Sequence, residues 1–287
     1  MGADKGPDPP TTLIDPALLK EHMDARRANM IILDCSYDLN RNVEKDYLTG
    51  HIPGALYFSI KECRDKSSPY PQMLPPAPVF AQFVGALGID NNTYIVVYDN
   101  NPRGLFGAAR VYWMFRAFGH DKISILNGGY VGWKAKHYPT TMQRDYLTPR
   151  VFHATMRAGY LTTFEDVVQT IKGVTSLPAQ LVDVRPPTLY QCGHLPKSKN
   201  MPYYSLLNDP LPTLKDEDGL RKAFAAASID LDQPIVSYCN SGVAASMLFL
   251  AGILLGKTPE EITVYDGSWW EWDRRAKGHH GYIEYSL

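Results

Sequence analysis

Cys239 is the residue whose position most directly predicts chemistry. It follows the apolar run Ile235-Val236-Ser237-Tyr238 and precedes a short loop, after which a helix is expected over residues 244–255. A thiol before a helix N-terminus lies among backbone N–H groups and a partial positive charge, which favour the reactive thiolate. In a parallel α/β sheet, the carboxyl end of a strand is also where ligands bind. We therefore predict that Cys239 is a nucleophile that attacks soft sulfur and passes it on.

The loop after Cys239 is predicted to cradle an anion. Curling a loop of small residues would aim several backbone N–H groups at one point. Such a cradle suits a persulfide, which is more acidic than a thiol and needs its negative charge stabilised. The alternative, an inert cysteine buried in a strand-to-helix turn, fits the local sequence equally well. The residues assigned to the cradle are Asn240, Gly242, Val243 and Ala244.

Other cysteine chemistry is less well supported. Cys35, Cys63 and Cys192 have no glycine-rich cradle, so structural or incidental roles are expected for them. A phosphatase with a cysteine loop needs an arginine six positions after the nucleophile, where its guanidinium holds the phosphoryl oxygens. Ala245 occupies that position here. No close cysteine pair suggests a zinc site, and we expect neither a metal nor an organic cofactor.

An internal repeat shows how the cysteine is positioned. Gly50-His51-Ile52-Pro53 recurs as Gly193-His194-Leu195-Pro196, and further landmarks recur in the same order about 140 residues apart. A period of this length indicates duplicated domains rather than a solenoid. We expect His51 to be a buried, hydrogen-bonded loop residue. The predicted domains are residues 11–140 and 159–287, joined by a linker over 141–158.

Each copy alternates short β-branched runs with helical segments, which predicts an α/β fold. The clearest helices are Leu105 to Phe118 and Ala244 to Leu255, and each directly follows a predicted strand. Strands that alternate with helices form a mainly parallel sheet with helices on both faces. Two such domains in tandem are therefore expected.

Composition limits the partners and the location. The 287 residues carry 29 Lys and Arg against 30 Asp and Glu, so no domain-wide basic field is available for nucleic acid. The longest apolar stretch is too short to span a bilayer. Acids at Asp4, Asp8 and Asp15 argue against a transit peptide, so we expect a cytoplasmic protein, with a mitochondrial one as the alternative. A monomer or weak dimer is expected.

Three further stretches of the sequence resemble motifs of the rhodanese and 3-mercaptopyruvate sulfurtransferase family, and the resemblance extends over essentially the whole chain. The stretches that carry the resemblance are residues 47–58, 111–120 and 264–272. The resemblance implies tandem rhodanese-like domains with one active site, on the second domain, because Asp99 stands at the matching position of the first. It also implies sulfur transfer from thiosulfate or 3-mercaptopyruvate through a Cys239 persulfide. Cyanide, a small thiol or a thioredoxin-like protein would then accept the sulfur.

The residues around the nucleophile resemble the mercaptopyruvate branch, which typically has a serine two positions after the cysteine. Ser241 is therefore assigned as a second catalytic residue. The Asp and His that accompany this serine in the family are replaced, at the corresponding positions, by Lys61 and Gln72. Leu189 stands at the position of one donor-binding arginine, and Arg185, one turn earlier, is assigned to substrate binding.

These departures leave an alternative function open. A rhodanese fold that had lost turnover would serve as a persulfide sensor or as a protein-binding module. Three lysines, Lys61, Lys197 and Lys199, could replace the missing positive charge, although solvated surface positions are the simpler expectation for each.

Overall fold

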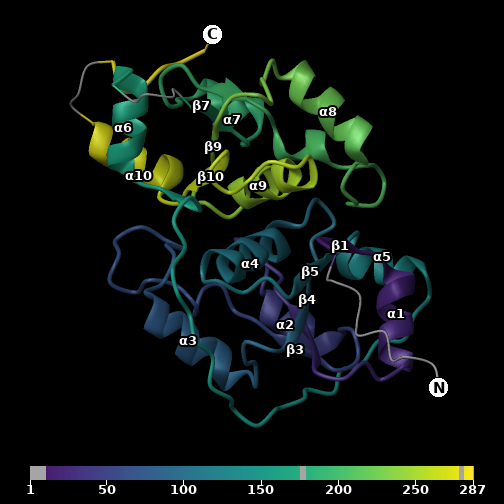
Figure 1. Ribbon diagram of the computed structural model, residues 1–287. Coiled ribbons are helices and arrows are strands. Elements are labelled where there is room, and N and C mark those ends of the chain that lie inside the picture. The colour runs from purple at the N-terminus through teal and green to yellow at the C-terminus, as the bar shows by residue number, and fades with distance from the viewer. Residues whose placement is uncertain (1–10, 175–178, 278–280, 287) are drawn as a thin grey trace, which may run out of the picture.

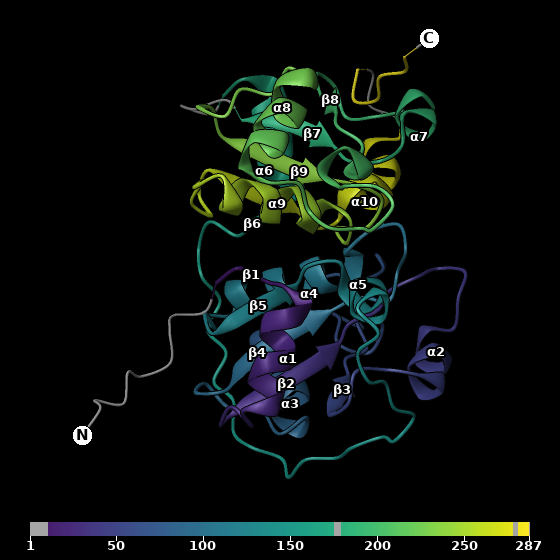
Figure 2. The same ribbon diagram turned by 90° about the vertical axis from the view of Figure 1, so that its right-hand side faces the viewer.

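The computed structural model describes residues 11–174, 179–277 and 281–286. Residues 1–10, with two of the acids used to predict the location, lie outside the described residues. The chain forms two α/β halves stacked one above the other, with the N-terminal half below in Figures 1 and 2. The predicted fold class, two duplicated α/β domains with parallel sheets, is confirmed.

The first half contains a five-stranded sheet with the order β1-β5-β4-β2-β3, and all of its strand pairs are parallel. Strand β4 is buried along its whole length, as expected for a parallel strand that is covered on both faces. The strands are β1 (Leu13–Ile14), β2 (Met30–Asp34), β3 (Ala55–Tyr57), β4 (Tyr94–Tyr98) and β5 (Ile123–Leu126). The helices are α1 (Pro16–Asp24), α2 (Val43–Thr49), α3 (Ala77–Ala86), α4 (Phe106–Ala117) and α5 (Gly129–Ala135).

The second half repeats this topology in the order β6-β10-β9-β7-β8, again with parallel pairs. Each strand takes the place of the strand five numbers before it, which is the structural form of the sequence repeat. The strands are β6 (Leu161–Thr162), β7 (Gln180–Asp183), β8 (Lys199–Asn200), β9 (Ile235–Tyr238) and β10 (Ile262–Tyr265). The helices are α6 (Phe164–Lys172), α7 (Pro187–Gln191), a 3₁₀ turn (Tyr203–Leu206), α8 (Glu217–Ala226), α9 (Ala245–Leu254) and α10 (Ser268–Ala276).

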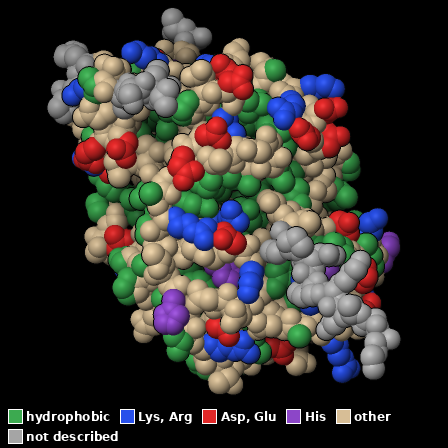
Figure 3. Space-filling view, viewed as in Figure 1, with side chains coloured by type: hydrophobic (Ala, Val, Ile, Leu, Met, Phe, Trp, Pro, Cys, Tyr) green, Lys and Arg blue, Asp and Glu red, His purple; other side chains and the backbone are tan. Residues whose placement is uncertain are grey.

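Helices cover both faces of each sheet. In the first half, α3 and α4 pack on one face, and α1 and α5 pack on the other. In the second half, α8 and α9 pack on one face, and α6 and α10 pack on the other. No helix in the described ranges has the length and apolar character that a bilayer span requires. On the face shown in Figure 3, Lys and Arg side chains are interspersed with Asp and Glu side chains.

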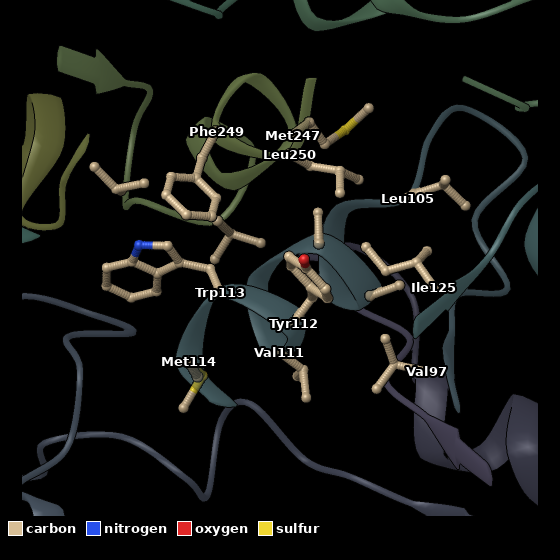
Figure 4. Close-up of a cluster of buried hydrophobic side chains, with 14 of the residues drawn as sticks. Val97, Leu105, Val111, Tyr112, Trp113, Met114, Ile125, Met247, Phe249 and Leu250 are labelled. Carbon is tan, nitrogen blue, oxygen red and sulfur yellow. The ribbon is translucent and has the colours of Figure 1, made fainter. Parts of the chain in front are cut away.

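Helices α4 and α9 join the two halves into one core. Both helices are buried along most of their length, because each packs on its own sheet and on the other helix. Trp113 and Tyr112 of α4 approach Phe249 and Leu250 of α9 in Figure 4. The indole N–H of Trp113 also donates to the carbonyl oxygen of Tyr160 at 3.1 Å. This packing holds the loop before α9 against the first domain.

Candidate active site

A cavity of ≈ 240 Å³ lies where loops at the carboxyl ends of both sheets meet. The loops after β2 and β4 line it from the first domain, and the loops after β7 and β9 line it from the second. Cys239 directly follows β9, lines the cavity and is 4% exposed. Two sheets thus present their ligand-binding edges to one space. Residues that line the cavity include Tyr37, Asp38, Asn101, Arg103, Arg185, Cys239, Asn240, Ser241, Val243 and Ala244.

The backbone N–H groups of the loop between Cys239 and α9 form two sets, one hydrogen-bonded and one not. Cys239 and Gly242 donate theirs to Ser268 Oγ, both at 3.1 Å. The other N–H groups of the loop find no hydrogen-bond acceptor in the part of the chain that the structure describes. These four groups belong to Asn240, Ser241, Val243 and Ala244, and all four residues line the cavity.

Gly242 contributes its backbone conformation to the cradle, and not its N–H. Its φ of +76° lies in the left-handed region, which glycine adopts without strain. A Cβ at this position would lie 2.7 Å from the carbonyl oxygen of Asp266 and 3.1 Å from Nη1 of Arg110. Gly242 therefore shapes the loop, and its N–H is held by Ser268.

The Trp-rich motif of residues 264–272 holds the cysteine loop in place. Ser268 donates its own hydroxyl to the carbonyl oxygen of Tyr265 at 2.7 Å while it accepts the two loop N–H groups. The backbone N–H groups of Trp269 and Trp270 donate to two carbonyl oxygens of the cysteine loop, both at 3.0 Å. The motif thus fixes both the donors and the acceptors of the loop's backbone.

Two stretches of the chain, residues 15–136 and 165–275, match the family model described as a rhodanese-like domain. The chain belongs to this family. Its two matched stretches contain the two sheets, so the sequence repeat is a pair of rhodanese-like domains.

Curated relatives of the chain include sulfurtransferases. The chain is 40% identical over 259 residues to thiosulfate sulfurtransferase of Bos taurus, which covers 85% of each chain. It is 34% identical over 281 residues to 3-mercaptopyruvate sulfurtransferase of Homo sapiens, which covers 92% of this chain and 93% of that one. Among solved structures it is similar to SseA of Escherichia coli, a 3-mercaptopyruvate sulfotransferase, with a TM-score of 0.82 and 32% identity over 91% and 99% of the two chains. The predicted family and the enzyme class, sulfurtransferase, are confirmed.

The first rhodanese-like domain carries an acid where the second carries its cysteine. Asp99 directly follows β4, as Cys239 follows β9, and it is 1% exposed. Its Oδ2 accepts the backbone N–H of Gly107 at 2.6 Å, and burial raises its pKa well above the ordinary value. Asp99 thus helps to anchor the N-terminus of α4.

Arg185, predicted to bind the donor, lies beside the cavity and already has partners. Its Nε and Nη2 donate to the carboxylate of Asp183 at 2.6–3.0 Å, and Nη2 also donates to the carbonyl oxygen of Gly193 at 2.8 Å. The guanidinium lies 4.7 Å from the ring of Trp269. Nη1 has no hydrogen-bond acceptor among the described residues, so this atom is the one that Arg185 can offer to an anionic donor.

Ser241 lies beside Cys239 at the cavity. Ser241 is 6% exposed and lines the cavity, and its catalytic role stays a prediction. Lys61 and Gln72, which replace the family's Asp and His, are not among the described residues that line the cavity. Lys197 Nζ donates to Ile171 O at 3.1 Å, and Lys199 Nζ donates to Gln180 Oε1 at 2.7 Å. These three lysines therefore bring no positive charge to the cavity.

None of the first-domain residues at the cavity was predicted, and four of them have polar side chains that matter for the site. Tyr37 and Asp38 follow β2, and Asn101 and Arg103 follow β4. Arg103 is largely exposed and pairs with the buried carboxylate of Asp38 at 3.3 Å. The signal in the sequence was their place after two predicted parallel strands, at the edge where ligands bind. To use this signal, one must also know that this edge of the first sheet faces the edge of the second sheet that carries Cys239.

The remaining cysteines have unsuitable surroundings for a nucleophile. Cys35 and Cys63 are fully buried. Burial raises the pKa of Cys35 well above the ordinary value and raises that of Cys63 to about 12. Cys192 is exposed and lies after α7, outside the cavity. Cys239 is thus the one free thiol of the described residues that lines the cavity.

The paired histidines of the repeat have matching structural surroundings. His51 is fully buried, with Nδ1 2.7 Å from Tyr47 O, and His194 Nδ1 lies 2.9 Å from Tyr190 O. Each ring stacks on the tyrosine it contacts, with centroids 3.9 and 3.7 Å apart. The expected buried and hydrogen-bonded state of His51 is confirmed. Across the described ranges, no group of three or more His, Cys, Asp and Glu side chains is arranged to hold a metal ion.

Proposed function

We propose that this protein moves a sulfane sulfur from thiosulfate or 3-mercaptopyruvate to a thiophilic acceptor through a Cys239 persulfide. The observation that carries the proposal is the place of Cys239, a thiol on a cavity between two domains with unbonded loop N–H groups beside it. The names of the relatives support both donors. They do not favour a catalytically degenerate persulfide sensor or binding module.

In the loading step, the Cys239 thiolate attacks the outer sulfur of the donor. A bond forms between the two sulfurs, and the donor's own bond to the transferred sulfur breaks with its electron pair. Thiosulfate then releases sulfite. From 3-mercaptopyruvate the broken bond is C–S, and the thiol proton of the donor moves to carbon, which gives pyruvate.

The persulfide formed in this step carries negative charge on its outer sulfur. We assign the stabilisation of that charge to the backbone N–H groups of Asn240, Ser241, Val243 and Ala244, together with the N-terminus of α9. Preformed N–H donors do not have to reorganise as the charge develops, so they favour the loaded state.

In the unloading step, an acceptor attacks the outer sulfur and the S–S bond breaks, so the Cys239 thiolate is restored. Cyanide would give thiocyanate, and a small thiol or a thioredoxin-like protein would give a new persulfide. No electrons are gained or lost over the cycle, so the proposal requires no redox cofactor.

Two arginines suit an anionic donor. Arg103 and Arg185 both line the cavity, and each also faces a carboxylate, Asp38 or Asp183. We propose that Nη1 of Arg185 and the guanidinium of the long, exposed Arg103 side chain contact the donor's charged group.

The test compares Cys239→Ser with Cys192→Ser, which removes an exposed thiol outside the cavity. After treatment with either donor, intact-mass measurement should show a gain of one sulfur atom in the wild type and in Cys192→Ser. Cys239→Ser should show no gain and should form no thiocyanate. No mass gain on the wild type with either donor would overturn the proposal.

The same assay separates the alternatives. A degenerate module would gain at most one sulfur per chain and would not turn over with cyanide and excess donor. A phosphatase has no observation in its favour, because Ala245 is a buried residue at the position where the phosphate-binding arginine would stand.

The acceptor, the oligomeric state and the location belong to the proposal as well. We propose a thiol or thioredoxin-like acceptor, a monomer or weak dimer, and a cytoplasmic location. Light scattering at several concentrations and fractionation of cells test the last two. A concentration-independent larger assembly, or recovery in a membrane-bounded organelle, would contradict them.

A further inference from the structure

We propose that Tyr37 is a further catalytic residue, whose hydroxyl donates a hydrogen bond to the sulfur carried by Cys239. The inference rests on the proposed function and deepens it, because it gives the first domain a direct part in the chemistry of the second. Tyr37 follows β2 of the first domain and lines the same cavity as Cys239 and Ser241.

The Tyr37 hydroxyl is buried without a partner. The residue is 8% exposed, and no described group meets the distance and angle of a hydrogen bond with its hydroxyl oxygen, although the Ser241 hydroxyl acts on its pKa from nearby. A buried polar group without a partner lowers stability, so its presence in a folded protein needs an explanation. A bound group that accepts a hydrogen bond only during the reaction provides one.

The surroundings of the phenol show which group that is. Burial is the main cause that raises the pKa of Tyr37, the charge of Cys239 raises it further, and the Ser241 hydroxyl lowers it. Tyr37, Cys239 and Ser241 line the same cavity, so the phenol and the carried sulfur face one space. Charged groups that also act on the phenol are Arg110, which lowers the pKa, and Asp38, which raises it.

The backbone that carries Tyr37 is held on two sides. Its carbonyl oxygen accepts a hydrogen bond from Asn101 Nδ2 at 3.4 Å, and the N–H of Cys35 donates to Tyr98 O at 2.8 Å. Helix α4 packs so closely that a Cβ on Gly107 would lie 3.2 Å from the Tyr37 Cβ. Because these contacts fix the start of the side chain, the hydroxyl is oriented before the donor arrives.

The phenol acts as a donor and not as a base. Burial raises its pKa to about 12, so Tyr37 keeps its proton throughout the neutral range. A neutral hydroxyl that donates to an anionic sulfur makes a charge-assisted hydrogen bond, which is stronger than one between neutral groups. The Cys239 thiolate and the outer sulfur of the persulfide are the anions that share its cavity.

The test uses Tyr37→Phe, which keeps the ring and removes only the hydroxyl. Tyr94→Phe is the matched control, because Tyr94 is also 8% exposed, lies in the first domain and donates to Ser124 away from the cavity. Each protein is equilibrated with mixtures of thiosulfate and sulfite, and the persulfide fraction is read from the intact mass. We expect the loading equilibrium constant to fall about 10-fold or more in Tyr37→Phe and to stay unchanged in Tyr94→Phe.

Two further readouts separate a catalytic hydroxyl from a structural one. Loss of a hydroxyl that has no partner should leave resistance to urea equal to or higher than that of the wild type. Loading should also perturb the near-ultraviolet absorption of tyrosine in the wild type and in Tyr94→Phe, and this perturbation should be smaller in Tyr37→Phe.

The outcomes distinguish this inference from the proposed function. If the wild type loads and Tyr37→Phe shows the same equilibrium and the same tyrosine signal, the assignment of Tyr37 is overturned. If the wild type itself never gains sulfur, both the proposed function and this inference are overturned. The tyrosine signal of the wild type needs no variant, so a variant that fails to fold does not prevent the test.

Discussion

Arg110 of helix α4 and Asp266 after strand β10 form an ion pair between the two domains, with Nη1 and Oδ1 2.6 Å apart. Both side chains are buried. Arg110 Nη2 also donates to the carbonyl oxygen of Gln72, and Asp266 Oδ2 accepts the N–H of Leu74, both at 2.6 Å. Since the cysteine loop packs against this pair at Gly242, the interface between the domains and the shape of the active site depend on the same contacts.

Asp266→Asn should strongly destabilise the protein. The amide keeps the size of the side chain but leaves the buried Arg110 charge without its partner, which costs about 3–5 kcal/mol. Urea unfolding measures the loss. Asp24→Asn is the control, because its ion pair with Lys20 is partly exposed and contributes about 0–1 kcal/mol. Equal losses in the two variants would show that the buried pair does not stabilise the interface.

Gly242→Ala should abolish turnover while Gly256→Ala should not. Both glycines have positive φ, +76° and +89°, so both variants bear the left-handed strain of about 1–2 kcal/mol. Only at Gly242 does the added Cβ meet another group, the Asp266 carbonyl oxygen at 2.7 Å. The cysteine loop must then shift, and a shift of this kind costs about 100-fold in rate. Thiocyanate formation tests this, and a Gly242→Ala enzyme as active as Gly256→Ala would contradict it.

Much of the fold could be predicted because short, contiguous stretches of the sequence carry the repeat. The apolar run before Cys239 forms strand β9 as expected, and the helices expected over Leu105 to Phe118 and Ala244 to Leu255 differ from α4 and α9 only by one residue at each end. Buried parallel strands and buried helices have continuous apolar runs, which need no knowledge of their distant neighbours to be recognised.

The sequence predicted Arg185 and the loop after Cys239, but it did not predict the other residues of the site. Ser268 follows Cys239 by 29 positions, and nothing in the sequence shows that its hydroxyl accepts the N–H groups of Cys239 and Gly242. Tyr37 and Arg103 come from another domain, and their contact with the cavity depends on how α4 packs on α9. Contacts of this kind are set by tertiary packing, which a single sequence does not encode locally.

Arg185→Ala should lose stability more at neutral than at acid pH. Burial raises the pKa of Asp183, and the Arg185 guanidinium opposes that shift. Without the guanidinium, ionised Asp183 is buried and unpaired, which costs about 3–5 kcal/mol. A carboxyl with a raised folded-state pKa binds a proton more readily when folded. The deficit should therefore shrink as the pH falls through that raised pKa.

Arg103→Ala provides the contrast to that variant. Its side chain is largely exposed, and Asp38 keeps the N–H of Asn40 as a donor at 2.8 Å, so the free energy of unfolding should fall by no more than about 1 kcal/mol. If Arg103 attracts the donor, the KM for thiosulfate should rise, and the effect should weaken as salt is added. Urea unfolding at two pH values and kinetics at two salt concentrations separate the two arginines. A pH-independent deficit in Arg185→Ala would contradict the role assigned to its ion pair.

Thiol labelling of the folded wild type should separate the two accessible cysteines, Cys192 and Cys239, from the two enclosed ones. Burial raises the pKa of Cys63 to about 12 and that of Cys35 well above its usual value, so both stay protonated and enclosed from neutral pH up to about pH 9. With iodoacetamide and peptide mass mapping, Cys192 and Cys239 should be alkylated and the buried pair should react only after denaturation. Prior loading with thiosulfate should move the label at Cys239 onto the added sulfur and leave Cys192 unchanged. Labelling of Cys63 in the folded protein at the rate of Cys192 would contradict the enclosed, protonated thiol.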